Sequence, residues 1–280
     1  MQLQTEVNHL FLIQKEEWGQ LGAALRQLED TKVKTLSWDN QFFVDVQFAP
    51  TKEAGTSIKD DSDSLQDAPC FLCETNRPAA QRGIPFLDRY VMLCHPFPIL
   101  KNHLVIPLHS HVPQRVGKKI GDMLILAGQL PDYAVFYNGP KCGAFTPRHF
   151  HFEAGLKTPA LLQGDNELRS CLSIDSEDRG EVEELFGDVM HYLRTRQPNE
   201  EEPMMNVIAF MEQGRYRLHI FPRRAYRPTC YHEEGSRKML ISPAAVDMAG
   251  CIVTEREEDF IKIEKQHVEE IFAQVSLPVI

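Results

Sequence analysis

The sequence predicts an α+β fold, because strand-like and helix-like patterns of apolar residues occur in one chain. Residues 41–48 alternate, with Val44 and Val46 on one side of an extended segment and polar residues on the other, which is typical of a half-buried strand. Residues 12–29 and 181–194 instead repeat apolar side chains every three or four positions, which predicts amphipathic helices. A hydrophobic content of 42% is ordinary for a globular protein, so a buried core is expected.

The other elements follow along the chain. A polar, acidic and Ser-rich stretch at 51–67 is expected to be a mobile connection. Beyond it the apolar patterns predict strands at 90–94, 104–107, 133–137 and 149–154 and a helix at 117–130. A Pro- and Glu-rich break at 197–203 is followed by expected strands at 206–211 and 215–221 and a last helix at 257–275. The order after the break echoes the first half, which favours a duplicated core.

Bulk properties exclude several classes of protein. No run of 18 apolar residues occurs and the first residues lack the pattern of a signal peptide, so we expect neither a membrane span nor secretion. Seven cysteines, an odd number, do not form a disulfide framework, and a reducing cytoplasm is the expected location. A net charge of −10 argues against binding to nucleic acid or anionic membranes, so a phosphate-bearing ligand must meet a locally basic pocket.

The most specific chemical feature is the run HFHFE at 149–153. In a strand, alternation places His149, His151 and Glu153 on one face. Phe150 and Phe152 then point into the core. A neutral imidazole can attack phosphorus and form a phosphoramidate, which divides one difficult displacement into two easier ones. The alternative interpretation is a pair of partly exposed histidines on a sheet.

A second feature is the C-x-x-C formed by Cys70 and Cys73, a spacing that lets two thiolates bind one tetrahedral zinc. The same spacing also occurs in redox-active and in simply buried cysteine pairs. If zinc is bound, His149 and one of His109 and His111 are the candidates for the remaining ligands. Such a zinc ion would be structural, since protein would supply all four ligands.

A third feature is a basic stretch in this acidic protein. Five arginines lie between residues 215 and 227, and alternation places Arg215, Arg217 and His219 on one face of a strand. Guanidinium groups suit phosphate, so Arg217 and His219, with Lys101, Lys141 and Arg148, predict a pocket for a diphosphate or sugar phosphate. The alternative is a solvated face of the sheet.

Taken together and in order, these motifs resemble the histidine-triad (HIT) superfamily, in its transferase branch. That branch includes galactose-1-phosphate uridylyltransferase, dinucleoside-tetraphosphate phosphorylase and the GDP-hexose phosphorylases, and the nearest match is similar to an uncharacterised bacterial group beside GDP-L-galactose phosphorylase. The stretches that carry the resemblance are VQF (46–48), PCFLC (69–73), PFPIL (96–100), HLVIP (103–107), YNGPKCGA (137–144), HFHF (149–152) and ISPAAVDMAG (241–250).

The resemblance implies a HIT-like antiparallel sheet with flanking helices and a nucleotidyltransferase or phosphorylase activity. The substrates would be a nucleoside diphosphate sugar or dinucleotide, with phosphate or a sugar phosphate as acceptor, and relatives are often homodimers. His151 would be the nucleophile. A structural zinc would be held by Cys70, Cys73, His149 and His111, with His109 as the other candidate. Asn138, Gly139 and Thr146 would contact ribose and phosphate.

Two positions depart from the pattern of the branch. Glu153 stands where a glutamine donates its amide to the phosphate of the covalent intermediate, and Ala49 replaces an expected asparagine. An ionised carboxylate at position 153 would repel that phosphate. We therefore expect Glu153 to be protonated or turned towards an arginine, or else an altered or lost activity. The alternatives to a transferase are a HIT-type hydrolase and a catalytically silent, zinc-stabilised nucleotide-binding protein.

These features predict three regions. Residues 1–66 hold the first helix, the first strand and the acidic connection. Residues 67–196 form the HIT-like catalytic half with the H-x-H strand, and residues 197–280 complete the sheet and the substrate pocket.

Overall fold

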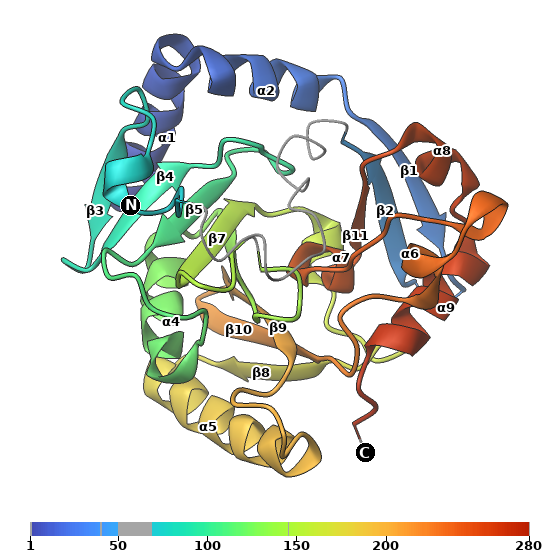
Figure 1. The fold of residues 1–280 in the computed structure, drawn as a ribbon. Coiled ribbons are helices and arrows are strands. Elements are labelled where there is room, and N and C mark those ends of the chain that lie inside the picture. Colours follow the sequence, from blue (N-terminus) through green and yellow to red (C-terminus); the bar gives the residue numbers. More distant parts are fainter. Residues whose placement is uncertain (1, 40, 50–68, 145, 280) are drawn as a thin grey trace.

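The computed structural model describes residues 2–39, 41–49, 69–144 and 146–279, and an eight-stranded antiparallel sheet lies at its centre (Figure 1). The strand order is β3-β4-β5-β7-β6-β9-β10-β8, and every neighbouring pair is antiparallel. The strands are β3 (Gly83–Phe86), β4 (Tyr90–Cys94), β5 (Leu104–Pro107), β6 (Tyr133–Asn138), β7 (His151–Leu156), β8 (Leu172–Ser176), β9 (Met205–Glu212) and β10 (Arg215–Pro222). The predicted α+β class with an antiparallel sheet is confirmed.

Helices cover one face of this sheet. They are α1 (Gln2–Glu17), α4 (Ile120–Gln129) and α5 (Arg179–Arg196), which pack on the strands through a core that includes Phe150, Phe152 and Tyr137. Helix α2 (Gly19–Glu29) then leads towards a second, smaller sheet (Figure 1). Across the described ranges, no helix is long and apolar enough to span a bilayer.

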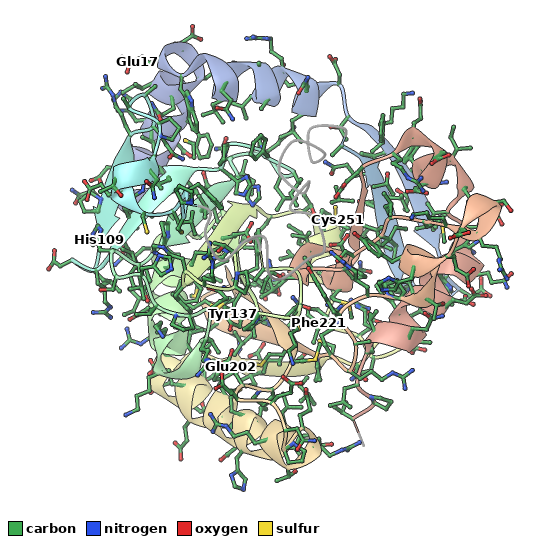
Figure 2. All side chains as sticks on the ribbon, in the orientation of Figure 1. Glu17, His109, Tyr137, Glu202, Phe221 and Cys251 are labelled. Atoms are coloured by element: carbon green, nitrogen blue, oxygen red, sulfur yellow. The ribbon has the colours of Figure 1, made fainter. Side chains whose placement is uncertain are left out.

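The smaller sheet packs on the other face and joins distant parts of the chain. It consists of β1 (Lys32–Ser37), β2 (Phe43–Phe48) and β11 (Cys251–Thr254), with β11 parallel to β2. Short helices surround it: α6 (Thr229–His232), α7 (Ala245–Ala249), α8 (Glu257–Lys262) and α9 (Lys265–Val275). A second core unites Phe136 and Ile208 of the large sheet with side chains of the small sheet and of α9. Figure 2 shows side chains filling the space between these layers.

The structure corrects several predicted boundaries. The expected helix at 12–29 is two helices, because the backbone of Trp18 is extended and its side chain is buried in the core. The helix expected at 257–275 is likewise broken at Ile263, which is extended and buried. In both places the apolar side chains continue at helical spacing through the break, so periodicity alone does not reveal it. The predicted mobile connection at 51–67 lies outside the described residues.

The H-x-H strand is shorter than predicted, since β7 begins at His151 and not at His149. Strands β1, β3, β8 and β11 were not predicted at all. The strands expected at 90–94 and 104–107 are confirmed with those bounds.

Candidate functional site

The site is built around strand β7, which lies between β5 and β6 near the middle of the large sheet (Figure 1). Alternation holds within the strand: Phe152 is fully buried in the helix-side core, as is Phe150 just before the strand, and His151 and Glu153 face the other way. Residues directly opposite each other in neighbouring strands share a face of the sheet. Glu153 is opposite Phe136, whose side chain belongs to the second core, so this face points towards the smaller sheet and α7.

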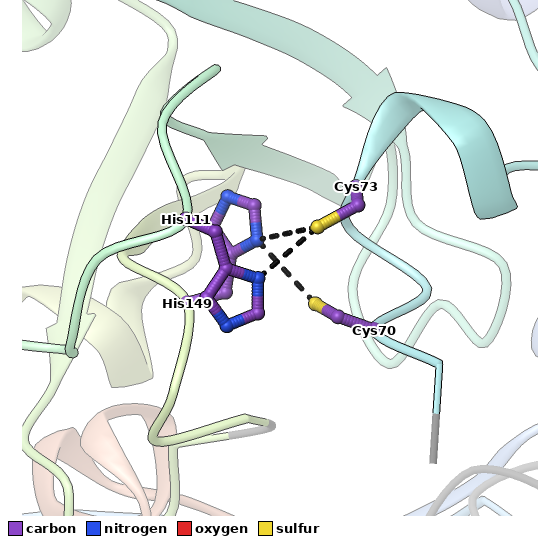
Figure 3. A group of neighbouring side chains, drawn as sticks. All are labelled: Cys70, Cys73, His111 and His149. Atoms are coloured by element: carbon purple, nitrogen blue, oxygen red, sulfur yellow. Dashed lines mark hydrogen bonds between the residues drawn. The ribbon is translucent and has the colours of Figure 1, made fainter. Parts of the chain in front are cut away.

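His149 lies just before β7 and takes part in a separate cluster with Cys70, Cys73 and His111 (Figure 3). Its Nδ1 is 3.4 Å from Sγ of Cys70 and 3.6 Å from Sγ of Cys73, and Nδ1 of His111 is 3.1 Å from Sγ of Cys73. Around a tetrahedral zinc with its usual bond lengths, sulfur and nitrogen ligands are roughly 3.5 Å apart. The cluster could therefore bind a metal such as zinc.

Two further observations support a metal in this cluster. Nε2 of His149 donates to the carbonyl oxygen of Leu108 at 2.7 Å, so Nδ1 carries the lone pair and faces the thiols. Metal-bound histidines usually have their other nitrogen held in this way. Of the two candidates for the fourth ligand, the structure brings His111 into the cluster, and His109 lies outside it near the edge of the molecule (Figure 2).

His151 presents one free ring nitrogen. Its Nδ1 donates to the carbonyl oxygen of His149 at 2.8 Å, so Nε2 carries the lone pair. Nε2 is buried and has no hydrogen-bond partner among the described residues, and the side chain is 1% exposed. Burial lowers the pKa of His151, which keeps the ring neutral at pH 7. A neutral imidazole can act as a nucleophile when one ring nitrogen is held by a hydrogen bond and the other has a free lone pair.

Gln114 holds this part of β7 in place. Its Oε1 accepts from the backbone N–H of His151 at 2.8 Å, and its Nε2 donates to the carbonyl oxygens of His151 and Asn138. Gln114 is fully buried, so its amide replaces strand-to-strand hydrogen bonds where the ends of β6 and β7 separate. The sequence motifs did not indicate this residue.

Glu153 is neither protonated nor turned towards an arginine, contrary to the first two expectations. Its Oε2 lies 3.0 Å from Nε2 of His103, and its Oε1 accepts from Nδ2 of Asn138 at 3.1 Å. Burial alone would raise the pKa of Glu153, but the interactions of its carboxylate with the neighbouring histidines, above all the hydrogen bond with His103, outweigh burial and lower it to about 2. The carboxylate is therefore ionised, and its Oε1 is 4.0 Å from Nε2 of His151.

His95 and His103 form a stacked pair behind this carboxylate, with ring centroids 4.3 Å apart. Nδ1 of His95 accepts from the backbone N–H of Phe97, and Nδ1 of His103 accepts from that of Ile99. A neutral ring whose Nδ1 accepts must carry its proton on Nε2, so His103 donates to Glu153. His103 belongs to the HLVIP stretch, but its role is not predictable from the sequence, because no local spacing connects position 103 with position 153.

The comparisons with known proteins place this chain in a family. Residues 10–156, just over half of the chain, match a family described as a domain of unknown function (DUF4922). The chain belongs to the DUF4922 family. No curated protein matches it in sequence.

Solved structures similar to the DUF4922 chain include yeast Ap4A phosphorylase Apa2. That structure has a TM-score of 0.65 at 14% identity, over 92% of this chain and 97% of the yeast protein. The structure of its complex with Ap4A has a TM-score of 0.66 at 16% identity, over 99% of this chain and 98% of the yeast chain. The structure of its complex with AMP has a TM-score of 0.60 at 15% identity, over 93% of this chain and 94% of the yeast chain. At this identity the likeness shows a shared fold across nearly the whole of both chains.

The C-terminal part of the DUF4922 chain forms hydrogen bonds with Asn138 of the site. Oδ1 of Asn138 accepts from Nδ2 of Asn206 and from the backbone N–H of Ala245, both at 2.8 Å. Nη1 of Arg223, a fully buried residue, donates in turn to Oδ1 of Asn206 at 2.7 Å. A continuous polar network thus runs from Arg223 to Glu153 across β9, β6 and β7. Asn206 gave no signal in the sequence, and Arg223 stood out only as one of the five arginines of the basic stretch, because the partners of both residues are distant along the chain.

The predicted phosphate-binding residues fall into two groups. Gly139, Thr146 and Arg148 lie in the connection between β6 and β7, next to His151 in the chain. Gly139 leaves room for the backbone, since a Cβ there would lie 2.9 Å from the carbonyl oxygen of Met205. Lys141 is in the same connection, but its Nζ pairs with Glu200 at 2.8 Å.

Arg217 and His219 are not brought to His151. They lie on β10, which is separated from β7 by β6 and β9. Arg217 forms ion pairs with Asp175 and Glu212. Both ring nitrogens of His219 have partners, the hydroxyl of Ser173 at 3.0 Å and the carbonyl oxygen of Leu162 at 3.2 Å. Both side chains are on the same face of the sheet as Glu153, as the strand register shows.

Proposed function

We propose that this protein is a nucleotidyltransferase of the phosphorylase type, acting on a nucleoside diphosphate sugar or a dinucleotide through a covalent nucleotidyl–His151 intermediate. The observation that carries the proposal is the bare, buried Nε2 of His151, with Nδ1 donating to the carbonyl oxygen of His149. The fold shared with an Ap4A phosphorylase, solved with AMP and with Ap4A, supports a nucleotide as the ligand.

The reaction has two displacements at one phosphorus. Nε2 of His151 attacks the α-phosphorus with its lone pair, forming a P–N bond while the P–O bond to the leaving group breaks. That group departs as a sugar phosphate from a nucleotide sugar, or as a nucleoside polyphosphate from a dinucleotide. An oxygen of inorganic phosphate or of another sugar phosphate then attacks the same phosphorus and breaks the P–N bond. Neutral His151 is thereby restored with its Nδ1–H still held by the carbonyl oxygen of His149.

Residues around His151 position the substrate in this proposal. The amide of Asn138 and the connection that carries Gly139, Thr146 and Arg148 contact ribose and phosphate. Cys70, Cys73, His111 and His149 hold zinc, which supplies rigidity and no chemistry to the reaction, because protein provides all four ligands. The same His149 that anchors the metal orients the nucleophile through its carbonyl oxygen.

A covalent adduct tests the proposal directly. The protein is incubated with GDP-glucose or with Ap4A labelled at the α-phosphorus, without acceptor, and the adduct is located by mass spectrometry under alkaline conditions that preserve phosphoramidates. We expect label on His151 in wild type, release of label on addition of inorganic phosphate, and no label in His151→Ala. His109→Ala, which changes an exposed histidine outside the cluster, should be labelled normally. Since His151 is 1% exposed, labelling also requires the site to open. Absence of adduct and of product across a broad panel of nucleotides would contradict the proposal.

The ionised Glu153 beside His151 favours one alternative, a catalytically silent nucleotide-binding protein stabilised by zinc. A fixed carboxylate 4.0 Å from Nε2 repels the phosphate of a covalent intermediate. This alternative predicts that nucleotides raise the melting temperature of wild type and of His151→Ala equally, with no turnover in either. Activity that appears in Glu153→Gln and is absent from wild type would identify a repurposed enzyme. Turnover that does not depend on phosphate would instead identify a hydrolase.

A further inference from the structure

A buried amide separates the ends of β6 and β7 beside His151. Oε1 of Gln114 accepts from the backbone N–H of His151 at 2.8 Å, and Nε2 donates to the carbonyl oxygens of His151 at 2.9 Å and of Asn138 at 3.0 Å. A primary amide has two N–H donors, so both are used here. If the amide were turned over, Nε2 would face an N–H group and Oε1 would face two carbonyl oxygens. Only one orientation of Gln114 therefore fits, and its side chain is fully buried.

The strand register shows what this amide replaces. Strands β6 and β7 pair directly as far as Phe136 and Glu153. Continued by two residues, that register would set Asn138 opposite His151, with direct hydrogen bonds between the strands. Gln114 instead bonds to the backbones of both residues, so its side chain acts as a spacer between them. The separation of Asn138 from His151 thus depends on the length of the glutamine side chain.

Gln114 is itself fixed to the connection that leads into β7. It lies between β5 and α4, and its own backbone N–H donates to the carbonyl oxygen of Pro147 at 3.0 Å. Its carbonyl oxygen accepts from the hydroxyl of Tyr137 at 3.2 Å. Nearby, the backbone N–H of Phe150 donates to the carbonyl oxygen of Val112 at 2.7 Å. Gln114 therefore joins the end of β6, the start of β7 and the connection between them.

We propose that Gln114 is a positioning residue for nucleotidyl transfer, and that its side chain sets the distance between Nε2 of His151 and the phosphorus of the bound substrate. This inference rests on the proposed function, in which Asn138 and the connection contact ribose and phosphate. In this role Gln114 acts through the backbones of Asn138 and His151 and does not contact the reacting atoms.

Attack by the imidazole depends steeply on that distance. Reacting atoms must approach to about 3–3.5 Å with their orbitals aligned, and a misplacement of about 1 Å can cost roughly 100-fold in rate. Asparagine carries the same amide but is shorter by one carbon–carbon bond, about 1.5 Å. In Gln114→Asn the amide cannot reach all three backbone groups. Asn138 is also paired with β9, so His151 is the residue that we expect to move.

Gln14 offers a matched control for loss of stability. Its side chain is also fully buried and also bridges backbone groups, since Nε2 donates to the carbonyl oxygen of Ala80 at 2.9 Å and Oε1 accepts from the N–H of Arg82 at 2.8 Å. It lies on α1, on the helix side of the large sheet, whereas His151 faces the other side. Gln14→Asn therefore shortens a comparable buried amide without reaching the site.

Single-turnover labelling separates positioning from binding. Each protein is mixed with increasing concentrations of Ap4A or GDP-glucose labelled at the α-phosphorus, and adduct formation on His151 is followed at a temperature where every variant is folded. For Gln114→Asn we expect the saturating rate to fall roughly 100-fold, while the half-saturating concentration changes less than about threefold. Gln14→Asn should keep both values within about twofold of wild type.

Three results of this assay would overturn the inference. They are a saturating rate for Gln114→Asn close to that of wild type, weaker binding by Gln114→Asn at an unchanged rate, and an equal fall in rate in Gln14→Asn. The last would show that the rate follows stability and not position.

A ring signal of His151 gives a readout that needs no substrate. In protein labelled with ¹⁵N-histidine, the Nδ1–H of His151 is held by the carbonyl oxygen of His149 at 2.8 Å and is identified by its absence in His151→Ala. We expect this signal in wild type and in Gln14→Asn, and a shifted or lost signal in Gln114→Asn, since the backbone that carries the ring has moved. An unchanged signal in folded Gln114→Asn would contradict the inference. Absence of labelling in wild type would overturn the proposed function, and the ring signal would still decide whether Gln114 positions His151.

Gln114→Glu serves if Gln114→Asn does not fold. The acid has the length of glutamine, and in its protonated form it accepts from the N–H of His151 and donates to one carbonyl oxygen. One of the three hydrogen bonds is then lost, so the saturating labelling rate should fall at least about fivefold. A Gln114→Glu rate equal to that of wild type would show that the spacing does not depend on this amide.

Discussion

Nε2 of His103 and Oε2 of Glu153 lie 3.0 Å apart, in a pair that is almost entirely buried and joins the start of β5 to β7. The pair explains how a carboxylate stays ionised next to His151. It also makes the stability of the fold depend on the charge of Glu153.

We therefore predict a difference in acid sensitivity between wild type and Glu153→Gln. The pKa of Glu153 is lowered from 4.5 to about 2 in the folded protein, so its contribution to stability is fully present above pH 4.5 and is lost as the pH falls towards 2. The contribution is about 3 kcal/mol, from the size of that shift. Chemical denaturation at several pH values should show wild type losing stability more steeply than the variant between pH 4.5 and pH 2. Parallel curves would mean that the carboxylate has an ordinary pKa.

The cysteine cluster is predicted to stabilise the fold through zinc. Cys73→Ser, or a chelator added to wild type, should remove about one zinc per chain and lower the melting temperature by roughly 10 °C or more, since structural zinc contributes several kcal/mol. Cys230→Ser, which changes a cysteine outside the cluster, should keep its zinc. Elemental analysis and thermal melts check both statements. A wild-type protein purified under reducing conditions with no metal in the cluster, and indifferent to added zinc, would disagree with this prediction.

The network from Arg223 to Glu153 is predicted to depend on Asn206. Asn206→Ala removes the acceptor for Nη1 of Arg223 and a donor to Asn138, and leaves both groups buried. We expect a loss of about 1–3 kcal/mol in unfolding free energy and weaker labelling of His151, because Asn138 loses its orientation. Asn199→Ala, at an exposed position, should change neither quantity. Unfolding in urea and the adduct assay measure the two effects, and a stable Asn206→Ala with normal labelling would exclude a role for the network.

Two glycines should respond to alanine in opposite directions. Gly143 has φ +88°, and a Cβ there would lie 2.7 Å from Cβ of Ala244, so Gly143→Ala should cost about 1–3 kcal/mol and displace the connection before β7. Gly187 lies inside α5 with open space around it, so Gly187→Ala should stabilise the protein by about 0.5–1 kcal/mol. Equilibrium denaturation measures both values. A neutral Gly143→Ala would show that the connection can shift without cost.

Patterns local to the chain predicted much of this protein. Alternation in 149–153 placed His151 and Glu153 together on one face of a strand, because side-chain direction in a strand follows from backbone geometry alone. The spacing of Cys70 and Cys73 predicted half of a metal cluster, because two cysteines separated by two residues can bind one metal ion. The resemblance to the transferase branch supplied the antiparallel sheet, which the structure confirms.

Tertiary structure alone decided which distant groups meet these residues. His103 and Asn138 reach Glu153 only because β5 and β6 flank β7. Their hydrogen bonds keep Glu153 ionised, with neither the added proton nor the arginine partner that the sequence suggested. The choice of His111 over His109 likewise depends on how the chain turns after β5. Arg217 shares a face with His151 in the pattern but lies three strands away, because periodicity specifies the side of a sheet and not the position across it. Hydrogen bonds between strands determine that position.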